Sequence, residues 1–126
     1  MTKAKDIMKK KVITVRDNAK VEEASKLLIE KKLSGVPVVD KNQNLVGFVS
    51  EKDIIKAIGS KDFLKKSVRD VMMRKVTSVE ENASLDYIEE LFTEKHLRRV
   101  PIVRGRKVVG IISRKDVIKR LMGHYY

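Results

Sequence analysis

The sequence GFVSEKD (residues 47–53) returns 63 residues later as GIISRKD (residues 110–116). Each copy has a glycine, two apolar residues, a serine, two charged residues and an aspartate. The similarity extends outward: when Asp6 is aligned with Asp70, an offset of 64 holds as far as Val39, and 14 of these 34 pairs are identical. The second copy then lacks one residue, so the offset of the closing phrase is 63. The chain is therefore an internal duplication, and its two copies are expected to have the same fold.

Both copies predict the same order of elements, β-α-β-β-α. Short runs rich in β-branched residues predict the first strands, helical spacing of apolar residues predicts the first helices, and a proline within each middle strand predicts a strand start or an edge strand. We expect Asn18 and Asn82, or the acidic residues before them, to cap the first helices. The predicted strands are 12–15, 35–40 and 45–50 with 76–79, 99–104 and 108–113, the hairpin turns are 41–44 and 104–106, and the closing helices are 51–58 and 114–122.

This order predicts a mixed α/β (α+β) fold. Residues 1–58 form the first repeat, the polar residues 59–67 a linker, and residues 68–126 the second repeat. A repeat of this size with three short strands buries little surface by itself. We therefore expect the two repeats to pack sheet to sheet with pseudo-two-fold symmetry.

The composition limits the classes of function. Of the 126 residues, 42% are hydrophobic and none is cysteine or tryptophan, which predicts an aliphatic core, no disulfide, no thiolate metal site and a cytoplasmic location. No apolar run approaches the ~20 residues of a membrane helix, and the first residues predict no signal peptide. The net charge of +12 is spread along the chain, which suits phosphate-bearing ligands, nucleic acid or an acidic partner, or simply solubility.

The doubled phrase has two interpretations. Ser50 with Asp53, and Ser113 with Asp116, have the spacing of a capping box at the start of a helix, which requires no ligand. The same helix start also offers N–H groups and a serine hydroxyl to a phosphate, while the aspartate oxygens match the two hydroxyls of a ribose. For the serines, both interpretations can hold together.

Taken together, these features resemble a tandem pair of CBS domains, a Bateman module. The resemblance rests on the repeated element order, on SGVPVVD (34–40) and RRVPIV (98–103), and on the two phrases above. It covers nearly the whole chain. It implies that the aspartate binds ribose, that the serine approaches phosphate, and that apolar side chains hold adenine.

The resemblance also implies that each site is shared, with the closing phrase of one copy facing the front of the other. Two nucleotide-binding sites follow from it. Site one comprises Met8, Ile13, Leu33, Ser34, Val36, Ile111, Ser113 and Asp116. Site two comprises Phe48, Ser50, Asp53, Met72, Thr77, Leu97, Arg98, Arg99 and Val100.

The two predicted sites differ in charge. Site two has Arg98 and Arg99 where site one has Ser34 and Gly35, and arginine suits forked contact with phosphate. We expect AMP, ADP or ATP at site two, and an adenosine derivative without phosphate such as S-adenosylmethionine, or no ligand, at site one. The alternative for the arginines is a solvated strand edge. Met8 and Met72 fit either a core gap or a purine face.

No motif indicates an enzyme: the chain has no phosphate loop of the Walker type, no metal-binding spacing and no recognisable nucleophile with its base. Three hypotheses remain. The chain is a non-catalytic sensor of adenine nucleotides that acts on a separate, unknown effector protein, or a basic nucleic-acid-binding protein, or a scaffold that only dimerises. The resemblance also implies a homodimer through the apolar stripes of the closing helices, although core burial is the alternative; these stripes are Ile54, Ile55 and Ile58 with Val117, Ile118 and Leu121.

Overall fold

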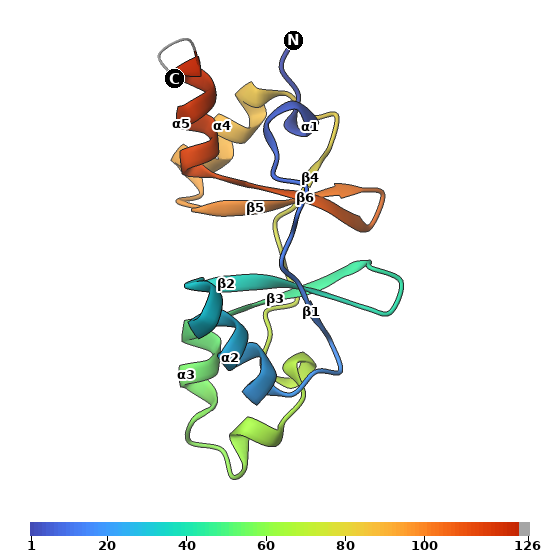
Figure 1. Ribbon diagram of the computed structural model, residues 1–126, viewed down its shortest axis with the longest axis vertical. Coiled ribbons are helices and arrows are strands. Elements are labelled where there is room, and N and C mark those ends of the chain that lie inside the picture. The colour runs from blue at the N-terminus through green and yellow to red at the C-terminus, as the bar shows by residue number, and fades with distance from the viewer. Residues whose placement is uncertain (124–126) are drawn as a thin grey trace. The chain divides into compact units, whose positions relative to one another are not determined.

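The structure is a computed structural model that describes residues 1–123 of the chain. The chain forms two compact units (Figure 1). The central unit comprises residues 13–76, and the terminal unit comprises residues 1–12 together with the chain from residue 77 onward. In the described residues the strands form two three-stranded sheets, one in each unit. The predicted mixed α+β class is confirmed.

The central unit has the sheet order β1-β2-β3, with β1 (Val15–Arg16) parallel to β2 (Gly35–Val39) and β2 antiparallel to β3 (Leu45–Ser50). Helix α2 (Val21–Lys31) follows β1, α3 (Glu51–Ala57) follows β3, and two short 3-10 turns, η1 (Phe63–Lys65) and η2 (Val68–Asp70), complete the unit. Its core is aliphatic and is built by β-branched strand residues against α2: Val15, Ala24, Leu28, Val36, Val38, Val49 and Val68.

The terminal unit repeats this plan. Its sheet order is β4-β5-β6, from β4 (Val79–Glu80), β5 (Arg99–Arg104) and β6 (Lys107–Ser113), with α4 (Leu85–Glu94) and α5 (Arg114–Leu121) in the places of α2 and α3. The short helix α1 (Ala4–Ile7) comes from the start of the chain. Ala4 is fully buried in the core of this unit, beside Val79, Ile88, Val100 and Ile112.

Both first helices begin later than the asparagines predicted. Helix α2 begins at Val21 and α4 at Leu85, so Asn18 and Asn82 lie in the preceding turns and the prediction that they cap the helices was wrong. The backbone supplies the cap instead, because the Val21 N–H donates to the Lys66 carbonyl at 2.8 Å and the Leu85 N–H donates to the Thr2 carbonyl at 3.0 Å. In α4 the hydroxyl of Ser84 accepts a further bond from the backbone of the third helical residue.

The prolines stand in the middle strands of the sheets and not at an edge, which corrects the edge expectation. Pro37 pairs with Phe48, whose N–H and C=O both bond to Met73 and not to β2. The missing N–H of Pro37 therefore faces the β1 side of β2, where β1 pairs only with Val38 and Val39. No ladder donor is lost there, so the strand tolerates the proline. Pro101 sits opposite Ile111 in the same way.

The segment before each repeat docks on the other repeat's sheet. We call residues 2–9 the first front segment and residues 66–73 the second front segment. In the terminal unit, the Ala4 N–H donates to the Ala83 carbonyl at 2.8 Å, and Lys9 exchanges two backbone bonds with Ile111 at 2.9 and 3.0 Å. In the central unit the corresponding bonds join Val68 to Ala19 at 2.7 Å and Met73 to Phe48 at 2.8 and 2.9 Å; each has the same place in its repeat.

This exchange explains why the compact units do not follow the sequence copies. The unit boundaries fall at 12/13 and 76/77. Residues 59–67 lie in the central unit, where η1 packs against α2. The division into 1–58, a linker over 59–67 and 68–126 describes the sequence repeats and stays a prediction.

Candidate functional site

The two closing phrases form matching capping boxes at the start of α3 and α5. The Ser50 N–H and Oγ–H both donate to Asp53 Oδ2 at 2.9 Å, and the Asp53 N–H donates back to Ser50 Oγ at 3.3 Å. In the terminal unit the Ser113 N–H and Oγ–H donate to Asp116 Oδ2 at 2.8 and 3.0 Å, and the return bond is again 3.3 Å. The capping interpretation of Ser-x-x-Asp is confirmed in both units.

Capping uses only one oxygen of each carboxylate. Within residues 1–123, Oδ1 of Asp53 has no hydrogen-bond or ion-pair partner. Oδ1 of Asp116 lies 3.7 Å from the ammonium nitrogen of Lys9. An ionised carboxylate has about four acceptor positions on its two oxygens. The cap and a ligand hydroxyl are therefore compatible on the same aspartate.

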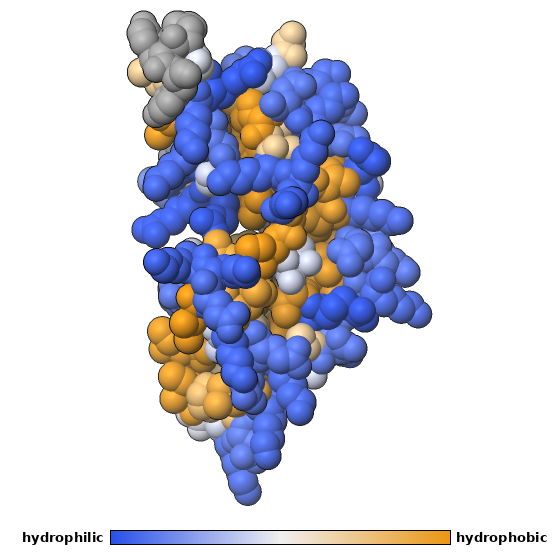
Figure 2. All heavy atoms as spheres, in the orientation of Figure 1, coloured by the Kyte–Doolittle hydropathy of each residue, from blue (hydrophilic) through white to orange (hydrophobic). Residues whose placement is uncertain are grey.

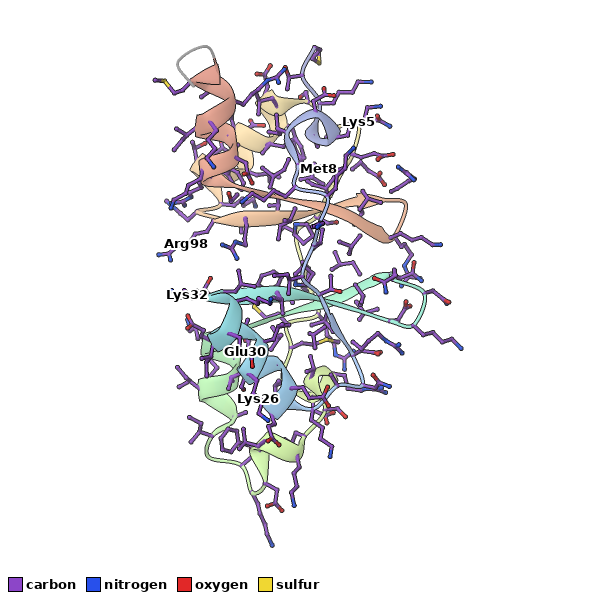
Figure 3. All side chains as sticks on the ribbon, in the orientation of Figure 1. Lys5, Met8, Lys26, Glu30, Lys32 and Arg98 are labelled. Atoms are coloured by element: carbon purple, nitrogen blue, oxygen red, sulfur yellow. The ribbon has the colours of Figure 1, made fainter. Side chains whose placement is uncertain are left out.

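The glycine of each phrase is needed because a methionine of the docked front segment packs over it. A Cβ on Gly110 would lie 2.7 Å from Met8 Cγ and 3.0 Å from Met8 Cβ, and a Cβ on Gly47 would lie 2.9 Å from Met72 Cγ and 2.8 Å from the Met73 carbonyl oxygen. All these distances are shorter than ordinary contact. Met8 lies on the first front segment beside the sheet of the terminal unit (Figure 3). The two methionines thus sit next to the closing phrases.

The residues before each middle strand are tied to the start of the closing helix in the same unit. The Glu51 N–H donates to the Ser34 carbonyl at 2.9 Å, and the Arg114 N–H donates to the Arg98 carbonyl at 3.1 Å. Arg114 adds a second bond from Nε to the Leu97 carbonyl at 2.7 Å. The side chain of Arg98 extends away from the ribbon of its unit and is exposed (Figure 3).

The structure distributes the predicted site residues over both units, and each predicted site draws on both. The combinations proposed for site one and site two therefore stay predictions. Val36 and Val100 are fully buried core residues. The central unit contains Ile13, Leu33, Ser34, Val36, Phe48, Ser50, Asp53 and Met72. The terminal unit contains Met8, Thr77, Leu97, Arg98, Arg99, Val100, Ile111, Ser113 and Asp116.

The prediction from sequence missed Lys9, which lies against Asp116 although the two residues are far apart in the chain. The offset of 64 pairs Lys9 with Met73, so a charged residue faces an apolar one at the same place in the two repeats. Two more pairs differ in charge in the same direction, since Arg98 matches the neutral Ser34 and Arg114 matches the acidic Glu51. The closing phrase of the terminal unit is therefore surrounded by more positive charge than its copy in the central unit.

The described residues show neither a metal-ligand cluster nor a membrane-spanning helix. Within residues 1–123, no group of three or more histidine, aspartate or glutamate side chains is placed to hold a metal ion. Over the same residues, none of the helices has the length and apolar character needed to cross a lipid bilayer.

Comparison with known proteins identifies the family. The model of the CBS domain matches the chain twice, over residues 4–60 and 68–123. The chain belongs to the CBS domain family. Among curated relatives, the protein YlbB of Bacillus subtilis is 36% identical over 121 residues, which are 93% of this chain and 80% of YlbB. L-aspartate semialdehyde sulfurtransferase of Methanocaldococcus jannaschii is 35% identical over 124 residues, but the chain spans only 24% of that protein.

Two solved CBS structures show which kind of ligand similar chains bind. CBSX2, crystallised in complex with AMP, is 30% identical and superimposes with a TM-score of 0.87 over 98% of each chain. The CBS domain pair of MJ0100, crystallised with 5-methylthioadenosine and S-adenosyl-L-methionine, is 34% identical with a TM-score of 0.78 over 99% of this chain and 98% of that one. CBS pairs similar to this chain therefore bind adenosine derivatives.

Proposed function

We propose that this chain is a non-catalytic regulatory module that binds adenine nucleotides and passes its ligand state to a separate effector protein. The observation that carries the proposal is the pair of closing phrases, in which an aspartate is held by a capping box with one carboxylate oxygen left for a ligand. Similar chains were crystallised with AMP, 5-methylthioadenosine and S-adenosyl-L-methionine. Their common feature is adenosine, and the ribose hydroxyls are the donors that an aspartate accepts.

The ligands are assigned to the two proposed sites by charge. Site two, with Asp53, Arg98 and Arg99, binds AMP, ADP or ATP, because arginine pairs well with phosphate oxygens. On the residues before the middle strands alone, site one, with Asp116, would accept S-adenosylmethionine or stay empty. The absence of cysteine from the chain fits a cytoplasmic location.

Ligand-dependent stabilisation tests the proposal directly. A ligand present at a hundred times its Kd stabilises the folded state by about 2.7 kcal/mol, which corresponds to a rise in Tm of roughly 10 °C for a chain of this length. We expect such a shift with AMP, ADP or ATP, and none with GMP. A panel of adenosyl ligands that leaves the Tm unchanged would contradict the proposal. A shift with short DNA that falls steeply with salt would instead favour a nucleic-acid binder.

The aspartate and its cap are separated by a matched pair of variants. Asp53→Asn keeps an oxygen for the cap but puts an amide donor in the place of Oδ1, so it should weaken AMP binding at site two with little change in stability. Ser50→Ala removes the hydroxyl that bonds to Asp53 twice, so it should lower stability by about 1 kcal/mol. Ser50→Ala should still leave the ribose contact in place. Isothermal titration with adenosine, which offers Ser50 no phosphate, in which the two variants lose affinity equally would place the role of Asp53 in folding alone.

We also propose a homodimer through α3 and α5. Ile55 and Ile58 on α3 are 64% and 54% exposed, and the matching Ile118 and Leu121 on α5 are 56% and 59% exposed. Figure 2 shows an apolar group over α3. Ile29 of α2, a helix that contacts α3, is 77% exposed. The remaining members of the predicted stripes, Ile54 and Val117, pack in the cores. Equivalent apolar faces on two repeated helices suit a second copy of the chain related by closed symmetry.

A further inference from the structure

The two closing-phrase aspartates have the same cap but different second contacts. Oδ2 of each accepts from its own serine at distances that agree within 0.1 Å. Oδ1 of Asp116 faces Lys9 Nζ at 3.7 Å. At the matching place in the central unit stands Met73, which has no charge, and Oδ1 of Asp53 has no partner within residues 1–123. The two carboxylates thus share their cap but differ in what faces Oδ1, and Asp116 is also more buried than Asp53.

Lys9 is held beside Asp116 by its backbone. Its N–H and C=O form a reciprocal pair with Ile111, two residues before Ser113, at 2.9 and 3.0 Å. Met8, its neighbour, packs over Gly110 and fixes the same stretch of the front segment. The lysine side chain is 63% exposed and can move, whereas the Asp116 side chain is only 8% exposed. The ammonium group therefore stands over the one side of the carboxylate that the cap leaves open.

We propose that Lys9 is a specificity-determining residue that competes with neutral ribosides for Asp116. This inference rests on the proposed function, in which Asp116 accepts ribose hydroxyls. A nucleoside without a phosphate has to displace the Lys9 ammonium group from Oδ1, and it offers that ammonium group no other anion. A nucleotide brings an anion to which the displaced ammonium can turn, because lysine is a flexible point charge. Asp116 thus selects phosphate-bearing ligands over neutral ones, and Asp53, whose unit has the uncharged Met73 at the place of Lys9, does not make this selection.

The assignment reverses the expectation that site one prefers an adenosine derivative without phosphate. That expectation counted Ser34 and Gly35 but not Lys9, because sequence distance hid its contact with Asp116. The size of the effect follows from the exposure of Lys9: ion pairs of exposed side chains are worth about 0.2–1 kcal/mol, which corresponds to a change in Kd of up to about fivefold.

The exchange of matched residues between the repeats tests the inference. Asp53→Asn leaves Asp116 as the one carboxylate of the two closing phrases. Lys9→Met is then combined with Asp53→Asn, because the backbone bonds of Met73 show that methionine keeps the same pairing. Isothermal titration should show tighter adenosine binding, by about two- to fivefold, with AMP affinity unchanged or lower. Lys10→Met, which removes a neighbouring exposed charge, is the control and should change neither ligand. The reciprocal Met73→Lys in an Asp116→Asn chain should weaken adenosine binding by a similar factor.

Salt gives a second measurement of the same competition. In the Asp53→Asn chain, raising NaCl from 50 to 500 mM screens Lys9 from Asp116 and should tighten adenosine binding, and Lys9→Met should abolish this dependence. If Lys9→Met leaves adenosine affinity unchanged or lowers it, the competition is refuted while the proposed function stands. If neither the natural chain nor Asp53→Asn binds any adenosyl ligand, the proposed function itself fails.

Discussion

Gly110→Ala tests whether docking of the first front segment shaped the repeated phrase. The added Cβ would lie 2.7 Å from Met8 Cγ and 3.0 Å from Met8 Cβ, closer than side-chain carbons approach in folded proteins. Gly110 is a strand residue without a positive φ, so alanine causes no backbone strain there. The whole expected cost therefore comes from the contact with Met8.

The structure sets both the size of this cost and its remedy. Overpacking of this kind destabilises by about 1–3 kcal/mol, which lowers Tm by roughly 4–12 °C for a chain of this length. The three atoms nearest to the new Cβ all belong to the Met8 side chain. Met8→Ala removes Cγ and Sδ and leaves only the tight Cβ contact at 3.0 Å, so the double variant should be more stable than the sum of the two single changes predicts, by about 1 kcal/mol or more.

Gly47→Ala is the matched comparison in the central unit. There the added Cβ would meet not only Met72 Cγ at 2.9 Å but also the Met73 carbonyl oxygen at 2.8 Å. Met72→Ala relieves only the first contact, so rescue should be weaker than in the terminal unit. In each unit, urea unfolding of the natural chain, the glycine variant, the methionine variant and the double variant gives the coupling energy between the two residues. Additive losses at Gly110 and Met8, or equal rescue in the two units, would show that the methionine contacts are not why glycine stands in the phrase.

Two further predictions concern pH and assembly. The hydrogen bond from Arg104 holds the pKa of Glu81 in the folded protein below its usual range. The Glu81 carboxylate therefore stabilises the fold at pH values above its pKa in the unfolded chain, near 4.3. This contribution is lost as the pH falls through the lower pKa of the folded protein. Arg104→Gln should raise that pKa, as measured by NMR titration, and the stability difference between the two proteins should be smaller at pH 2 than at pH 7; a Glu81 pKa that does not move would contradict this. Ile55→Glu with Ile118→Glu should convert a dimer to a monomer in analytical ultracentrifugation, whereas Lys10→Met should not, and a monomeric natural chain would refute the proposed homodimer.

The repeat made most of the fold predictable. Asp6 aligned with Asp70 yields one element order for both halves, and the β-branched residues around Pro37 and Pro101 locate the middle strands. Ser-x-x-Asp placed the start of α3 and α5 correctly, because a capping box is a local signal that depends only on residues three apart.

Other features depend on partners that are distant in the sequence. The start of α2 is set by the carbonyl of Lys66, and a backbone acceptor has no signature in sequence, so Asn18 was a reasonable but wrong choice. Strand β1 has only two residues because it pairs only with the end of β2. This pairing makes β2 the middle strand, so Pro37 does not lie at an edge of the sheet. The contact of Lys9 with Asp116 was hidden for the same reason.

The exchange of front segments gives the duplication a physical consequence. Each sheet is completed by a strand-like segment that belongs to the other copy, so neither copy contains all the backbone partners of its own closing strand. The two units have been able to diverge in charge at Lys9 and Met73 without losing this pairing, because the pairing uses backbone atoms and the methionine before each of these residues is the same. Because backbone bonds hold the two repeated units together internally, the side chains around the two aspartates are free to differ. Two sites that differ on one chain can respond unequally to two ligands.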